Sequence, residues 1–152
     1  MKAKKLVWKS DGKRHSVELE GRCNTFNIKC NYDGTFKVEL PFRKVDCETL
    51  EEAMETAQIV ADFLVNLFSK PLEWEDRVND PKLIKKSLGG KPLFRVKHGR
   101  RILFPIKQAS GDSWEINLGF GKKHIYNDED VCKSAAQADA NWLFKVLAES
   151  PE

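Results

Sequence analysis

The chain has 152 residues, of which 41% are hydrophobic and 32% charged, so it can bury the core of one ordinary domain or of two small ones. No apolar run approaches the roughly 18 residues of a membrane-spanning helix. The basic start MKAKKLVWKS is not followed by the apolar stretch of a secretory signal. We therefore expect a cytoplasmic protein without a membrane partner, and the net charge of +3 does not by itself favour any other partner.

The first part of the chain alternates apolar and polar residues, as strands do. KLVWKSDGK at 5–13, HSVELEG at 15–21 and TFNIKC at 25–30 predict three strands. NYDGTFKVELPF at 31–42 predicts a fourth, preceded by a hairpin turn at Asp33-Gly34.

The period then changes to that of a helix. TLEEAMETAQIVADFLVNLF at 49–68 places small and apolar residues at helical spacing, and Thr49 with Glu52 three residues later is typical of a capping box. A polar segment with two prolines, 69–81, then predicts a connector.

The remainder of the chain predicts the same order of elements. LFRVKHG at 93–99, RRILFPIKQ at 100–108 and SWEINLGF at 113–120 predict strands, and a helix follows from about residue 128 to 148. Acidic residues at the start of this helix suit the positive end of its dipole.

The two parts also resemble each other residue by residue. FNIKC at 26–30 matches FPIKQ at 104–108 with a shift of 78, and AQIVADFL at 57–64 matches AQADANWL at 136–143 with a shift of 79. Matches in the same order, including LVWKSDGK at 6–13 with LIKKSLGG at 83–90, indicate an internal duplication.

The sequence therefore predicts an α+β fold. A unit of three to four antiparallel strands and one helix (ββββα) occurs twice, at residues 5–68 and 82–148, on either side of the connector. Because each half is too small for a large core, we expect the halves to pack as one pseudo-two-fold domain.

Charge is segregated along the chain. Residues 1–44 hold 11 Lys and Arg against 5 Asp and Glu, and residues 91–126 hold 8 against 2, whereas residues 45–68 hold 6 acids and no base. The strand regions are thus basic and the helical regions acidic. If each helix covers one face of a sheet, the other face carries the positive charge, which is typical of a phosphate-backbone binder. Plain solvation is the alternative interpretation.

The order of strands and then a helix, twice over, resembles that of the Whirly-type single-stranded DNA-binding proteins. This resemblance implies a single-stranded ligand, and the absence of a basic helix also favours single-stranded DNA or RNA over a duplex. We expect the phosphates to contact basic residues of strands and turns, with Trp8 as a stacking candidate. These residues are Lys29, Lys37, Arg43, Lys44, Arg100, Arg101, Lys107, Lys122, Lys123 and Trp8.

A protein-interaction module is the alternative function, as an adaptor or an inhibitor, for example a phage-encoded one. Its contact surface would be the acidic patch of the first helix, Glu48, Glu51, Glu52 and Glu55, or the sheet. The oligomeric state is left open.

Catalytic motifs are missing from the sequence. It contains no GxSxG, HExxH or P-loop, and its three histidines lie beside basic residues in predicted turns. The four cysteines form no CxxC pair and have no zinc-ligand spacing with the histidines, so buried thiols are favoured over a metal site. We expect a non-enzymatic protein without a cofactor.

Overall fold

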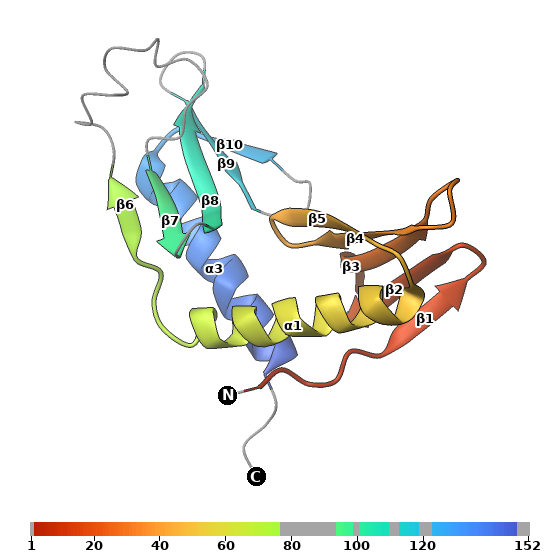
Figure 1. Ribbon diagram of the computed structural model, residues 1–152. Coiled ribbons are helices and arrows are strands. Elements are labelled where there is room, and N and C mark those ends of the chain that lie inside the picture. The colour runs from red at the N-terminus through yellow and green to blue at the C-terminus, as the bar shows by residue number, and fades with distance from the viewer. Residues whose placement is uncertain (1, 77–93, 99–100, 110–112, 119–122, 149–152) are drawn as a thin grey trace. The chain divides into compact units, whose positions relative to one another are not determined.

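The computed structural model describes residues 2–76, 94–98, 101–109, 113–118 and 123–148, except the side chains of Cys23, Asn24, His98 and Arg101. In these residues five strands and a helix are followed by five more strands and a second helix (Figure 1). The first set is β1 (Trp8–Asp11), β2 (Arg14–Leu19), β3 (Arg22–Cys30), β4 (Phe36–Leu40), β5 (Arg43–Cys47) and α1 (Leu50–Phe68). The second is β6 (Trp74–Asp76), β7 (Phe94–His98), β8 (Arg101–Gln108), β9 (Trp114–Asn117), β10 (Lys123–Tyr126) and α3 (Glu129–Leu147).

Each set of strands forms an antiparallel sheet in which neighbours in sequence are neighbours in space. The orders are β1-β2-β3-β4-β5 and β10-β9-β8-β7-β6. The chain is therefore α+β with a duplicated unit of sheet and helix, as the sequence predicts.

The expected number of strands was wrong, because each described sheet has five rather than three to four. The strands that the prediction missed, β5, β6 and β10, are all at sheet edges, and they have three to five residues each. An edge strand this short is held by the hydrogen-bond ladder of its neighbour and needs no alternating apolar pattern. β6 lies within the segment that we expected to be a connector, and the segment 83–90, matched to the first strand, lies outside the described residues.

By contacts, the chain forms two compact units, Met1–Lys70 with Asn141–Glu152, and Pro71–Ala140. The first unit contains the first sheet and α1, and the second contains the second sheet. Helix α3 begins in the second unit and ends in the first.

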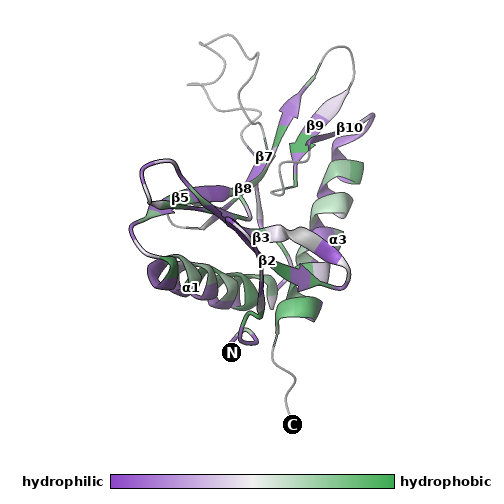
Figure 2. Ribbon diagram, turned by 90° about the vertical axis from the view of Figure 1, so that its right-hand side faces the viewer, coloured by the Kyte–Doolittle hydropathy of each residue, from purple (hydrophilic) through white to green (hydrophobic). Residues whose placement is uncertain are grey.

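The core of the first unit lies between its sheet and α1, which contacts β3, β4 and β5. Alternation along the strands turns Phe26, Ile28 and Val38 inward, and all three are fully buried. They meet the buried stripe of α1, which includes Ala57, Ala61 and Leu64. Figure 2 shows the matching bands of hydrophobic and hydrophilic residues along this helix.

The start of α1 agrees with the sequence prediction. Thr49 has an extended backbone, and its Oγ1 accepts a hydrogen bond of 3.1 Å from the backbone N–H of Glu52. This bond satisfies one of the N–H groups that the first turn of a helix leaves without a partner.

The duplication is confirmed by equal burial at matched positions. Phe104, Ile106 and Ile116, which correspond to Phe26, Ile28 and Val38, are also fully buried. The register repeats as well, because Ile28 pairs with Val38 and Ile106 pairs with Ile116. In the helices the matched pairs Ala57 and Ala136, Ala61 and Ala140, and Leu64 and Leu143 are buried alike.

No helix within the described ranges combines the length and apolar character needed to cross a bilayer.

Candidate functional site

The face of the first sheet opposite α1, called here the open face, carries the charged side chains of the central strands. Phe26, Ile28 and Val38 point toward α1, so their neighbours Lys29 and Lys37 lie on the open face. Strand register then determines which charges are adjacent.

One row of the open face crosses all five strands. The register pairs Asp11 with Arg14, Arg14 with Lys29, Lys29 with Lys37, and Lys37 with Asp46. The three central positions, Arg14, Lys29 and Lys37, are called the cation row. It spans two strand spacings, about 10 Å, and an acid stands at each end.

Like charges directly opposite each other destabilise a sheet. The cation row contains two such pairs, and only part of their charge is compensated. Lys29 Nζ lies 2.7 Å from Glu39 Oε1, whereas no ion pair joins Arg14 or Lys37 to a carboxylate in the described ranges. The hydrogen bond from Lys29 lowers the pKa of Glu39, so that carboxylate stays ionised.

The next row of the open face is electrically mixed. It runs Lys9, Ser16, Asn27, Glu39 and Lys44 across the five strands. Lys9 Nζ pairs with Glu18 Oε2 at 2.6 Å. The positive charge of this face is therefore concentrated in the cation row.

Other predicted contact residues of the first unit lie elsewhere. Arg43 is exposed on the edge strand β5 opposite Leu40, whose side chain is buried, so Arg43 lies on the side of the sheet that α1 covers. Trp8 pairs with the buried Val17, is half-buried, and lines a recess of about 540 Å³ beside Met54 and Gln58 of α1. Neither residue joins the cation row.

Among its described residues, the second sheet has no equivalent row. Lys107 corresponds to Lys29, but the position of Lys37 is taken by Glu115, which pairs with Lys107 at 3.1 Å. Lys123 is exposed opposite Asn117. Arg100 and Lys122 lie outside the described residues, as does the side chain of Arg101.

Arg14 was not among the contact residues that the sequence predicted. Its sequence signal is ambiguous, because Arg14 is next to Lys13 and His15 in a hairpin. Only the pairing of Arg14 with Lys29 places it in the row.

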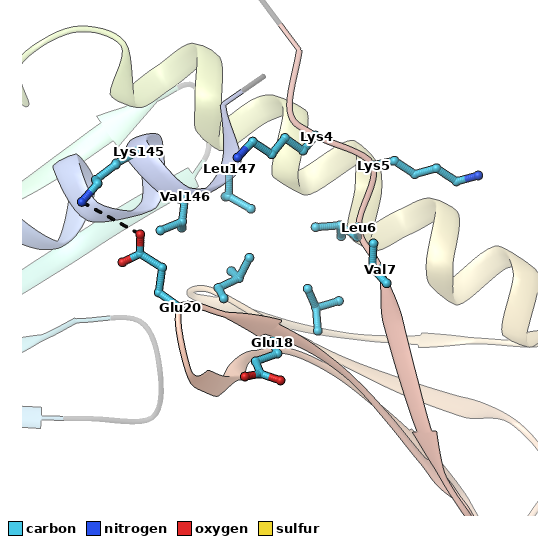
Figure 3. Close-up of a pocket in the computed structure, with 11 residues that line it drawn as sticks. Lys4, Lys5, Leu6, Val7, Glu18, Glu20, Lys145, Val146 and Leu147 are labelled. Carbon is cyan, nitrogen blue, oxygen red and sulfur yellow. Dashed lines mark ion pairs between the residues drawn. The ribbon is translucent and has the colours of Figure 1, made fainter. Parts of the chain in front are cut away.

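A pocket of about 490 Å³ lies at the C-terminal end of β2, away from Arg14 (Figure 3). Aliphatic side chains of the N-terminal segment, of β2 and of the end of α3 form its walls. Lysines and glutamates surround it, and the ammonium of Lys5 points away from it. Lys145 and Glu20 form an ion pair of 3.9 Å at one side. Because the rim has both signs of charge, it does not select an anion or a cation. The lining residues are Lys4, Lys5, Leu6, Val7, Val17, Glu18, Leu19, Glu20, Lys145, Val146 and Leu147.

The acidic patch of α1 is solvent-exposed, as all four of its residues, Glu48, Glu51, Glu52 and Glu55, are exposed. Glu55 also lines the recess beside Trp8.

A serine and a histidine meet on the first hairpin. Ser10 Oγ lies 2.6 Å from His15 Nδ1, and the two residues are cross-strand partners. A nucleophile and base of this kind need a third group that orients the ring, and no carboxylate contact to His15 occurs in the described part of the chain. Likewise, no cluster of three or more potential metal ligands is found there.

Comparison with known proteins gives no match: neither a family model, nor a curated protein, nor a solved structure resembles this chain significantly.

Proposed function

We propose that the chain binds nucleic acid without catalysing a reaction, and that the cation row of the open face contacts the phosphates of single-stranded DNA or RNA. The observation that carries this proposal is the direct cross-strand adjacency of Arg14, Lys29 and Lys37. Such an arrangement costs stability in the free protein, and a bound polyanion would offset that cost.

The position of the row argues against a role in solubility alone. Lysines that prevent aggregation are placed on edge strands, where backbone groups are unpaired. In this sheet the edge strands contribute Asp11 and Asp46 to the row, and the cations occupy the three central strands. Edge protection therefore does not account for them.

A single strand suits the row better than a duplex. The positive stretch of about 10 Å can reach only a few phosphates, and the first turns of α1 and α3 are acidic, which disfavours either helix in a major groove. With two or three phosphate contacts, the logarithm of the affinity should fall with the logarithm of the salt concentration at a slope of about −2.

The test is fluorescence anisotropy with labelled single-stranded DNA, single-stranded RNA and duplex DNA at several salt concentrations. The variant Arg14→Gln/Lys37→Gln should bind more weakly and reduce the slope by about 1.4, or about 0.7 for each lost contact. Lys29 is kept because it pairs with Glu39.

The matched control is Lys5→Gln/Lys70→Gln, which changes the net charge by the same amount. Both lysines are exposed, Lys5 in the N-terminal segment that Gln58 of α1 binds and Lys70 just after α1. Equal losses in the two variants would indicate attraction by net charge alone and would contradict a site at the cation row.

A further inference from the structure

A fully exposed tyrosine lies on the turn that follows β3. Tyr32 is the most exposed of the large apolar and aromatic side chains in the described residues. It occupies the turn Asn31–Thr35 between β3 and β4, at a position that most residue types can occupy. Neither burial nor backbone geometry therefore requires an aromatic ring there.

The turn holds this residue in a fixed place. Asn31 N donates to Thr35 O at 2.8 Å, and Gly34 N donates to Asn31 O at 3.2 Å. Side chains add further bonds: Asp33 Oδ1 accepts from Thr35 N at 3.0 Å, and Asn31 Nδ2 donates to Thr35 Oγ1 at 2.9 Å. The backbone of Tyr32 is thus ordered before any ligand arrives, which lowers the entropy cost of binding.

The turn adjoins the cation row. Lys29 and Lys37 are separated from it by a single cross-strand pair, Cys30 with Phe36. Tyr32 is three residues beyond Lys29, which is at most roughly 10 Å along the backbone. The turn between β1 and β2 lies beside the end of β3, since Cys30 N donates to Lys13 O at 3.1 Å.

We propose that the ring of Tyr32 is the platform on which one unpaired base stacks while phosphates of the same strand contact the cation row. This inference rests on the proposed function. It names the component of nucleic acid that the cations alone cannot recognise, namely an accessible base, and so predicts a preference for single strands over duplexes.

Charge distinguishes the place of the base, at Tyr32, from the place of the phosphates, at the cation row. Asp33 follows Tyr32 directly, and its hydrogen bonds with Thr35 lower the pKa of its carboxyl, so it is ionised at neutral pH. A carboxylate at the turn repels a phosphate but not a neutral base. The base therefore belongs at the turn, and the phosphates belong at Lys29 and Lys37.

The experiment compares Tyr32→Ala and Tyr32→Phe in the full chain with two probes, a labelled short oligothymidylate and inorganic polyphosphate. Tyr32→Ala should weaken oligothymidylate binding about 5- to 100-fold and leave the salt slope unchanged, because no phosphate contact is lost. Tyr32→Phe retains the stacking face and should bind within about two-fold of the original. Polyphosphate, which has no base, should bind all three proteins equally.

The outcomes distinguish this inference from the function on which it rests. If Tyr32→Ala binds oligothymidylate normally while Arg14→Gln/Lys37→Gln does not, stacking is wrong and phosphate binding stands. If Tyr32→Ala weakens both probes equally, Tyr32 contributes to phosphate binding rather than to base stacking, and stacking is again wrong. If none of these substitutions changes binding, both proposals are wrong.

Discussion

At the scale of single residues, one matched position distinguishes the charge pattern of the first sheet from that of the second. Lys37 of the first sheet stands opposite Lys29, whereas Glu115 of the second stands opposite Lys107 and forms an ion pair with it. The first sheet thus retains a like-charge pair at the position where the second sheet has an attractive one, and its Lys37 is opposite Asp46 on the other side.

Because Lys37 is also opposite Asp46, the test removes that second carboxylate charge as well: Lys37→Glu/Asp46→Asn should raise the free energy of unfolding by about 0.2–1 kcal/mol while weakening nucleic-acid binding. The matched control is Lys44→Glu, which places a glutamate opposite Glu39 and should lower the free energy of unfolding by a similar amount. Urea denaturation measures both changes. A loss of stability in Lys37→Glu/Asp46→Asn would contradict the view that the like-charge pair of Lys29 and Lys37 costs stability.

The pair of Lys29 and Glu39 should make stability depend on pH. The hydrogen bond from Lys29 lowers the pKa of Glu39 in the folded state below its unfolded value. The folded state then binds fewer protons, so the contribution is present above the unfolded pKa and is lost as pH falls through the folded one.

Lys29→Gln should accordingly differ most in stability from the original protein near neutral pH, and the difference should shrink below about pH 4. An NMR titration of the Glu39 carboxyl should show its pKa rising in the variant. An unchanged pKa would contradict the pairing.

At the scale of elements, the turn between β3 and β4 depends on a glycine. Gly34 has φ +85°, in the left-handed region, and an added Cβ would meet no atom within 4 Å. The whole cost of a side chain at this position is therefore backbone strain.

Gly34→Ala should lower the free energy of unfolding by about 1–2 kcal/mol, whereas Gly34→Asn should cost less, because asparagine tolerates this conformation. Chemical denaturation compares the two. Equal losses would mean that something other than backbone strain is responsible. If Tyr32 is a stacking platform, Gly34→Ala should also weaken oligothymidylate binding more than polyphosphate binding.

At the scale of the whole molecule, helix α3 contributes to both compact units. Its last residues are grouped with the first unit. Leu147 is 1% exposed, its carbonyl oxygen accepts a hydrogen bond of 2.7 Å from Lys4 N, and its side chain lines the same pocket as Leu6 and Leu19. The end of the second repeat thus completes the core of the first.

Leu147→Ala should lower the free energy of unfolding by about 2–5 kcal/mol, and amide hydrogen exchange should accelerate first in β2 and β3. The control is Leu118→Ala, at a buried position of the second unit, which should affect β8 and β9 first. If Leu147→Ala accelerated exchange only in β8 and β9, the assignment of the helix end to the first unit would be wrong.

Local patterns in the sequence were sufficient for most of the secondary structure. Alternation turned Phe26, Ile28 and Val38 to one face, Thr49 marked the start of a helix, and Asp33-Gly34 marked a hairpin. Each of these signals acts between residues a few positions apart, so it can be read without knowing the fold. The duplication could be read for the same reason, since the buried positions of both copies carry similar residues.

Pairing between strands was not readable, and it decided the candidate site. Arg14, Lys29 and Lys37 are far apart in the sequence, and only register makes them neighbours. A shift of one residue would move each strand's side chains to the other face. Tertiary structure also decided the short edge strands, whose hydrogen bonds come from their neighbours. It likewise decided the place of Leu147, which lines one pocket with Leu6 and Leu19 from the other end of the chain. The alternation and helical spacing of apolar residues determined the buried positions of the central strands and of both helices, because those preferences are local. The edge strands and the adjacency of charges depended on long-range pairing.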